Sequence, residues 1–345
     1  HVLYHWRAIE GSTALGAQEK GYAHQRAIKV LNDAIVRRNL SAEVLETGLG
    51  AYHRIRYNLP DPPPSVSVII PTKDRIDLLS VCLKGLLDKT SYANFEILVV
   101  DNNSAEARTL EYFEMIEKNE RVRVLRFPGE FNFSAINNFA VSKASGEIII
   151  LLNNDIEVIN ESWLTELVSH AARPGVGAVG CRLYYPDDHV QHDGIILGMG
   201  GVAGYAHPHS KREDSGEFGR SRVIRNYSAV TAAVLAIKKS IYNEVGGLNA
   251  DNLAVAFNDV DFCLRVKEAG YRNVYSPYSE LYHHESVSRG PDTDPIKAKR
   301  FEREAIYMKN KWKFFIDNDP AYNSNLSLME GYKIDINRGK KWPWG

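Results

Sequence analysis

The sequence predicts an α/β fold built on a doubly wound, Rossmann-like and mostly parallel β-sheet. Between residues 66 and 152, short apolar runs alternate with segments of helical periodicity. This alternation is typical of parallel strands that are joined by right-handed crossover helices. The run Ile148–Leu152, just after the turn residue Gly146, holds five large apolar residues in succession. An unbroken run of this kind indicates a strand that is buried on both faces.

The expected elements follow from these periodicities. Strands are predicted at residues 66–71, 95–101, 122–127 and 148–152. Helices are predicted at 76–87, 106–118 and 134–144, the last with Ser134 as its N-cap. Later the alternation loosens, and we expect strands at 176–183 and 275–281 and helices at 257–270 and 295–315. The first strand ends without Gly-x-Gly-x-x-Gly, which disfavours a fold for nicotinamide dinucleotides.

Four segments organise the chain. Residues 1–59 are expected to form an N-terminal helical extension, with an amphipathic helix at 14–39 and strand-like pieces at 42–45 and 52–59. The proline-rich stretch 60–65 is typical of a stiff linker. The α/β domain is expected at 66–315, and a C-terminal tail at 316–345.

The composition argues against several classes of protein. The 345 residues carry a net charge of −1 with the two signs interspersed, so no nucleic-acid partner is expected. No apolar run approaches the roughly 20 residues that a membrane-spanning helix needs, and no signal peptide is recognisable. The cysteines, Cys82, Cys181 and Cys263, are expected to be buried thiols. We therefore expect a cytoplasmic location, with peripheral association at the inner face of the cell membrane as an option.

Two polar clusters follow predicted strands, and each has two interpretations. Asp101 could bind a base or a ribose hydroxyl, or it could cap the next helix. Asp155 ends the cluster Asn-Asn-Asp and could bind Mg²⁺ or Mn²⁺, which prefer carboxylate and phosphate oxygens. The alternative is an Asx-turn, which these three residue types also favour. The position favours a site, because ligands of open α/β sheets bind at the carboxyl ends of the strands.

Further candidates lie in the second half of the chain. Asp259 and Asp261 fall in the first turn of a predicted helix, where either could cap the helix or act as a general base. His283 or His284 could complete a metal site, and Arg289 could neutralise phosphate. Four other histidines lack metal-ligand spacing and are expected to line a pocket or the surface: His189, His192, His207 and His209.

The order of these clusters is more specific than any one of them. Along the chain stand strand–Pro-Thr-Lys-Asp, strand–Asp-Asn-Asn-Ser, Phe-Asn-Phe-Ser-x-x-Asn, strand–Leu-Asn-Asn-Asp, Asn-Asp-Val-Asp-Phe-Cys-Leu-Arg and His-His-Glu-Ser-x-Ser-Arg-Gly. The series resembles the family 2 inverting glycosyltransferases of the GT-A fold, especially those of bacterial surface polysaccharides such as O-antigens, rhamnosyltransferases among them. The resemblance covers roughly residues 66–307. It implies a GT-A domain with a smaller acceptor-side subregion.

The resemblance also implies a role for each matching residue. The residues that would bind the nucleotide are Pro71, Thr72, Asp74, Asp101, Asn137, Asn154 and Arg289. A divalent cation, Mn²⁺ or Mg²⁺, would be bound by Asp155 and His283. The general base would be Asp259, and the sugar and acceptor pocket would be lined by Thr231, Ala232 and Asn258.

Two residues depart from the family's pattern. Asn153 stands where the metal motif usually begins with aspartate, so the metal site carries less negative charge. Asn258 replaces the first acid of the base motif, so Asp259 lacks a neighbouring carboxylate that would raise its pKa. Neither departure removes a residue with a central role.

The implied activity is inverting transfer of a sugar from a nucleotide-diphosphate donor, such as dTDP-rhamnose or a UDP-hexose, to a hydroxyl of a glycan or lipid-linked glycan. Residues 1–7 resemble the end of a similar upstream domain, so the chain could be one module among several glycosyltransferase modules. The alternative is a non-catalytic module that binds glycan or scaffolds a polysaccharide synthase. A sugar nucleotidyltransferase is disfavoured, because the loop after the first strand is not glycine-rich.

Overall fold

The computed structural model describes Arg7, Ile9 and residues 22–49, 52–284, 295–335 and 337–338. The chain divides into two compact units, His1–Asn58 and Leu59–Gly345. In the first unit, the described residues form helix α1 (Tyr22–Arg37) and an antiparallel hairpin of β1 (Ala42–Glu46) and β2 (His53–Tyr57). Residues 14–21 of the expected helix and residues 1–6 lie outside the described residues.

The first half of the second unit follows the predicted alternation of strands and helices. Its elements are β3 (Val66–Thr72), α2 (Ile76–Lys89), β4 (Phe95–Asp101), α3 (Ala107–Ile116), β5 (Val122–Arg126), α4 (Phe133–Lys143) and β6 (Ile148–Leu152). Strand β3 pairs in parallel with β4 and β6, and β4 pairs in parallel with β5. One prediction is wrong: the N-cap of α4 is Asn132, whose side chain accepts a hydrogen bond from Ala135 N. The hydroxyl of Ser134 instead donates to Leu253 O.

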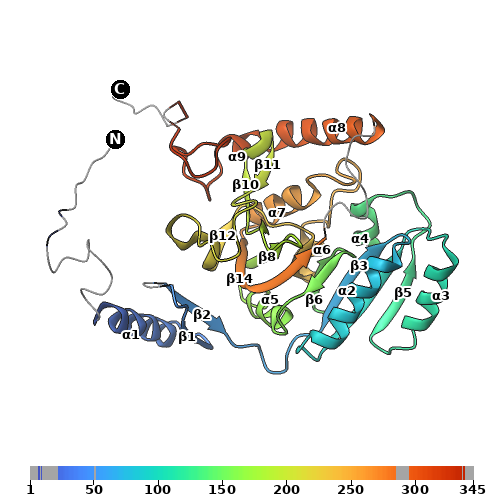
Figure 1. Cartoon of the computed structure of the whole chain (residues 1–345), viewed down its shortest axis with the longest axis horizontal. Helices are drawn as coiled ribbons and strands as arrows, with labels where there is room; N and C mark the ends of the chain where they lie inside the picture. The colour runs from blue at the N-terminus through green and yellow to red at the C-terminus, as the bar shows by residue number, and fades with distance from the viewer. Residues whose placement is uncertain are drawn as a thin grey trace. The chain divides into compact units, whose positions relative to one another are not determined.

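The second half mixes strand directions. Its elements are β7 (Ile156–Val158), α5 (Trp163–Ala171), β8 (Val176–Tyr184), β9 (Val190–His192), β10 (Ile195–Leu197), β11 (Ala203–Tyr205), β12 (Arg225–Tyr227), β13 (Val234–Lys238), α6 (Lys239–Glu244), α7 (Asn258–Glu268), β14 (Arg272–His283), α8 (Pro295–Lys311) and α9 (Lys313–Asp317). The main path of the large sheet runs β12-β14-β8-β13-β6-β3-β4-β5 (Figure 1). Because β13 is antiparallel to both β6 and β8, the sheet is mixed rather than parallel throughout.

The centre of the sheet is buried on both faces, as the apolar run predicts. Alternate residues of β6 belong to two different hydrophobic clusters: Ile149 packs in one and Ile150 in the other. Helices α4, α6 and α7 contribute to the first cluster, and α2, α3 and α5 to the second. Gly146 precedes β6, and a Cβ atom there would lie 2.4 Å from Ser67 N, so the close approach requires glycine. In the described part of the chain, no helix is long and apolar enough to cross a membrane.

The register of the strands brings distant segments to one edge of the sheet. The parallel strands β3 and β6 both end there, at Thr72 and Leu152. The antiparallel strand β13 begins there, because Val234 pairs with Leu152 and Asn153 N donates to Ala233 O. Strand β14 also ends there, since His283 pairs with Ile156 of β7. Residues 72, 153–156, 231–234 and 283 are therefore neighbours in space.

Candidate active site

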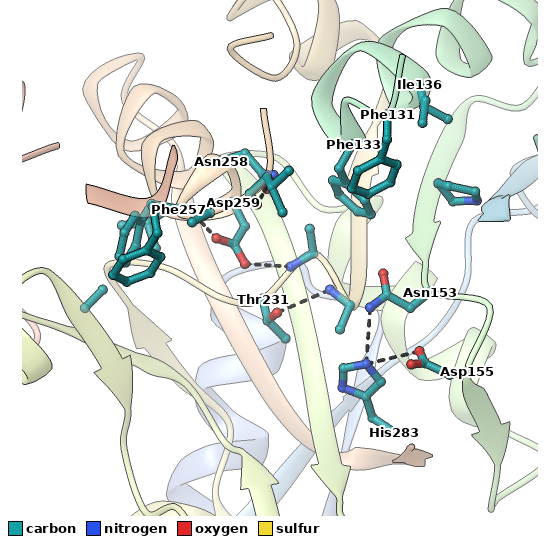
Figure 2. Close-up of a pocket in the computed structure, with 18 of the residues that line it drawn as sticks. Phe131, Phe133, Ile136, Asn153, Asp155, Thr231, Phe257, Asn258, Asp259 and His283 are labelled. Atoms are coloured by element: carbon teal, nitrogen blue, oxygen red, sulfur yellow. Dashed lines mark hydrogen bonds and ion pairs between the residues drawn. The ribbon is translucent and has the colours of Figure 1, made fainter. Parts of the chain in front are cut away.

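A cavity of about 730 Å³ opens at this edge of the sheet. Its volume is within the range of small-molecule sites. Many of the residues predicted from the sequence line it: Pro71, Thr72, Asn154, Asp155, Thr231, Ala232, Asn258, Asp259 and His283. Figure 2 shows Asp259 on one side of the cavity and the pair Asp155–His283 on the other.

Asp155 and His283 are both buried at one side of the cavity. Their exposed fractions are 4% and 5%, and His283 Nε2 lies 3.2 Å from Asp155 Oδ1 (Figure 2). The other ring nitrogen, Nδ1, lies 2.7 Å from Gln191 Oε1. The neighbouring His284 points elsewhere and contacts Glu157 Oε2 at 3.2 Å. Of the two candidate histidines, only His283 lines the cavity.

The residues present fit a divalent cation. Mg²⁺ and similar ions bind ligands at about 2.1 Å, so two ligands at right angles lie about 3.0 Å apart. The 3.2 Å between His283 Nε2 and Asp155 Oδ1 is close to that separation. Among the described residues, no group of three or more His, Cys, Asp or Glu side chains gathers around one point. Water and substrate phosphates would therefore supply the remaining ligands, as they commonly do for Mg²⁺.

Asp259 is held by backbone donors at the start of α7. Its Oδ2 accepts a hydrogen bond from Ala232 N at 3.1 Å, and its Oδ1 accepts one from Val260 N at 2.8 Å. The hydroxyl of Thr231 also bonds to this carboxylate. Burial raises the pKa of Asp259, while these hydrogen bonds act in the opposite direction. Burial thus shifts this pKa in the same direction as a second carboxylate at position 258 would.

The structure separates Asp259 from Asp261, which the spacing alone leaves equivalent. Asp261 is fully buried and does not line the cavity. Its carboxylate bonds to Arg265 Nε, Lys311 Nζ and Trp312 Nε1, each at 2.8 Å. These contacts tie α7 to the end of α8, so Asp261 anchors the helix that carries Asp259.

His192 supports the loop beside Asp259. Its imidazole is fully buried, Nδ1 contacts Cys181 O at 2.9 Å, and Nε2 accepts a hydrogen bond from Thr231 N at 3.3 Å. Burial lowers the pKa of His192 to about 4, so the ring is neutral near pH 7. The expectation of a pocket-lining or surface position is wrong for this histidine. The free cysteines Cys82, Cys181 and Cys263 are buried, as predicted.

Some predicted site residues do not line the cavity. The Asp74 carboxylate accepts hydrogen bonds from Ala105 N and Glu106 N, and Asp101 pairs with Arg126. Asn137 is fully buried in α4, where its amide donates to Phe133 O. Arg289 lies outside the described residues. The nucleotide-binding roles of these residues stay predictions.

The cavity also contains residues that were not among the predicted site residues. Helix α8 contributes Lys297, Arg300 and Phe301, and the Phe301 ring lies 5.2 Å from that of Phe257. Phe131 and Phe133 line the opposite part (Figure 2). The motif Phe-Asn-Phe-Ser contained a signal for the last two, whereas nothing in the local pattern of 295–315 marked α8 as part of a site.

The fold and this cavity define the class of the protein: the second unit is a GT-A type glycosyltransferase domain. Residues 67–236 match the model of glycosyl transferase family 2, and the chain therefore contains a domain of that family. Among solved structures, that of GalNAc-T7 with UDP, GalNAc and Mn²⁺ is similar in fold, with a TM-score of 0.56 at 15% identity. The similarity covers 74% of this chain and 51% of that one.

Two longer bacterial proteins resemble nearly the whole chain. The uncharacterized protein y4gI of Sinorhizobium fredii is 49% identical over 95% of this chain, which spans 36% of that protein. The O-antigen biosynthesis protein RfbC of Myxococcus xanthus is 39% identical over 94% of this chain, which spans 25% of its length. The chain thus covers about a third or less of each of these relatives.

Proposed function

We propose that the second unit transfers a sugar, with inversion, from a nucleotide-diphosphate donor to a hydroxyl of a bacterial surface glycan. One observation carries the proposal: a single cavity holds a carboxylate–imidazole pair suited to a divalent cation and, on another side, a carboxylate of raised pKa. The similarity to RfbC supports the class of product, because that protein is named for O-antigen biosynthesis. Rhamnose from dTDP-rhamnose and a hexose from a UDP donor are the sugars we propose to test.

The donor's diphosphate would lie at the Asp155–His283 pair. These two side chains would hold Mn²⁺ or Mg²⁺, which supplies positive charge to the leaving nucleoside diphosphate. The GalNAc-T7 structure contains UDP and Mn²⁺ together, which supports this pairing of ligands. Lys297 and Arg300 bring further positive charge to the cavity wall, which favours a phosphate-bearing substrate. Pro71, Thr72 and Asn154 would contact the nucleotide, and Asn154 Nδ2 is oriented by Thr72 Oγ1 at 3.0 Å.

Asp259 would act as the general base. The acceptor hydroxyl attacks the anomeric carbon as the bond from that carbon to the diphosphate oxygen breaks. The hydroxyl proton passes to the Asp259 carboxylate, and the new glycosidic bond forms on the face opposite the leaving group. The hydrogen bonds from Ala232 N and Val260 N hold the carboxylate in place for this step. Thr231, Ala232 and Asn258 would line the sugar and acceptor pocket, and the Phe257–Phe301 pair offers an aromatic face for a sugar ring.

The wider setting is also part of the proposal. Because related proteins are much longer, we infer that this domain works beside other glycosyltransferase modules on a glycan or lipid-linked glycan. The cytoplasmic location and the segment boundaries at 60, 66 and 316 remain predictions.

A screen of nucleotide sugars tests the proposal. The protein is incubated with dTDP-rhamnose, UDP-glucose, UDP-galactose or GDP-mannose, each with a surface-glycan acceptor and with or without Mn²⁺, and released nucleoside diphosphate is measured. We expect release with one donor, only with the cation, and faster with acceptor. Glycan binding without nucleotide release from any donor would contradict the proposal and favour a non-catalytic module.

A further inference from the structure

The imidazole of His283 is held between two amide side chains. Its Nδ1 lies 2.7 Å from Gln191 Oε1, and its Nε2 lies 3.2 Å from Asn153 Nδ2. Gln191 is fully buried in β9, and Asn153 directly follows β6. Nδ1 therefore faces the Gln191 oxygen, whereas Nε2 has two neighbours at 3.2 Å, the Asn153 amide nitrogen and the Asp155 carboxylate oxygen.

The polarity of the amide atoms selects one tautomer of the ring. An amide oxygen only accepts hydrogen bonds, so His283 Nδ1 must carry the hydrogen toward Gln191. An amide nitrogen only donates, so the contact with Asn153 favours Nε2 with a lone pair, in agreement with the Gln191 contact. The Asp155 Oδ1 atom, also 3.2 Å from Nε2, only accepts and would by itself favour Nε2–H. A cation between Nε2 and Asp155 Oδ1 would bind both atoms and take the place of the Asn153 hydrogen bond on the lone pair of Nε2.

We propose that Gln191 is a positioning residue that, together with Asn153, holds His283 as the Nδ1–H tautomer with Nε2 ready to bind a divalent cation. The part of this inference that concerns the cation rests on the proposed function.

The short strand β9 places Gln191 for this task. It pairs with β8, and at Leu183 the opposite edge of β8 pairs with β14, the strand that carries His283. Successive side chains of a strand point to opposite faces. Gln191 accordingly contacts His283, while the next residue, His192, accepts the hydrogen bond from Thr231 N. One strand of three residues thus supports both the cation side and the base side of the cavity.

Two substitutions at Gln191 and one control test the proposal through Mn²⁺ binding, measured by electron paramagnetic resonance without any sugar donor. Gln191→Leu removes the acceptor at similar size, and we expect Mn²⁺ affinity to fall by about 10- to 100-fold. Gln191→Glu retains an acceptor for Nδ1–H, and the affinity should not fall. The control is Asn160→Leu, because Asn160 bonds to the backbone of β14 at Tyr278 and Glu280 without contacting the ring.

A second measurement uses the metal-free protein. Nitrogen-15 spectra of the imidazoles, with His283 assigned by its loss in His283→Gln, report which ring nitrogen carries hydrogen. We expect Nδ1–H in the unmodified protein and in Gln191→Glu, and a different protonation pattern in Gln191→Leu. An Nε2–H or doubly protonated ring in the unmodified protein would overturn the proposal, as would unchanged spectra and Mn²⁺ affinity in a folded Gln191→Leu protein. If the unmodified protein binds no Mn²⁺, either alone or with a nucleoside diphosphate such as UDP, the metal role of the proposed function fails, while the spectra still decide whether Gln191 sets the tautomer.

Discussion

Replacing Asp259 by asparagine tests its proposed role as the general base separately from the rest of the site. The change removes the negative charge and the proton acceptor but keeps the size of the side chain. A general base contributes on the order of 10²- to 10⁴-fold to the rate, which corresponds to about 2.7–5.5 kcal/mol of activation free energy. We therefore expect kcat of Asp259→Asn to fall by that factor.

The structure also sets the effect on stability. Both oxygens of Asp259 accept a backbone hydrogen bond, from Ala232 N at 3.1 Å and from Val260 N at 2.8 Å. Asparagine has one acceptor oxygen, so one of these N–H groups would face an amide nitrogen, which costs about 1–3 kcal/mol. Because domains have about 5–15 kcal/mol of stability, the variant should remain folded. Circular dichroism during urea unfolding checks this point.

The assay is nucleotide release with the donor that the screen identifies, followed across pH. In the unmodified protein kcat/KM should fall at low pH, as Asp259 takes up a proton, and this acidic limb should vanish in Asp259→Asn. Asp261→Asn is the matched control, because Asp261 lies on the same helix but does not line the cavity. This substitution should lower the free energy of unfolding, whereas its kcat should fall less than that of Asp259→Asn. A folded Asp259→Asn protein with kcat within about tenfold of normal would refute the assignment.

Three further predictions concern neighbouring groups. Thr231→Val removes a hydroxyl whose hydrogen bond lowers the pKa of Asp259, so that pKa should rise and the acidic limb of kcat/KM should move to higher pH; an unmoved limb would contradict this link. Exhaustive chelation should abolish nucleotide release and Mn²⁺ should restore it, whereas Asp155→Asn should weaken Mn²⁺ binding by more than about tenfold; full activity after chelation would exclude an essential cation. Glu304→Gln leaves one acceptor for Val255 N and Ala256 N, which lie 3.2 and 2.8 Å from the buried carboxylate, so urea unfolding should show a loss of about 1–3 kcal/mol.

The sequence predicts the parallel half of the sheet well because its signals are local. Each strand from residue 66 to residue 152 is a short apolar run, and each helix between them shows its own periodicity. The antiparallel insertion of β13 between β6 and β8 has no such signal, because strand direction depends on partners that lie far away in the chain. The predicted cap of α4 is wrong for a similar reason, since the Ser134 hydroxyl donates to Leu253 O rather than capping its own helix.

The site residues also divide into those that a local sequence pattern predicts and those that depend on distant partners. The ends of β3 and β6 place Thr72 and Asp155 at one edge, which the patterns predict. The choice of Asp259 over Asp261 depends on which carboxylate meets Lys311 and Trp312, about 50 residues further on. Gln191, whose partner lies 92 residues away, carries no pattern at all, because a single buried amide is recognised only by its partner.

The buried carboxylates of the C-terminal region affect how such a domain could be exchanged between enzymes. The family match ends at residue 236, before Asp259, His283 and α8. A transplanted module that stopped just before α8 would keep those two residues. It would lose Glu304, which binds the loop ahead of Asp259, and Asp319, which accepts hydrogen bonds from Leu197 N and Ser228 Oγ. Chimaeras of these longer proteins should therefore be joined beyond residue 319, so that the loop ahead of Asp259 stays with α8 and the partners of Asp319 stay with that carboxylate.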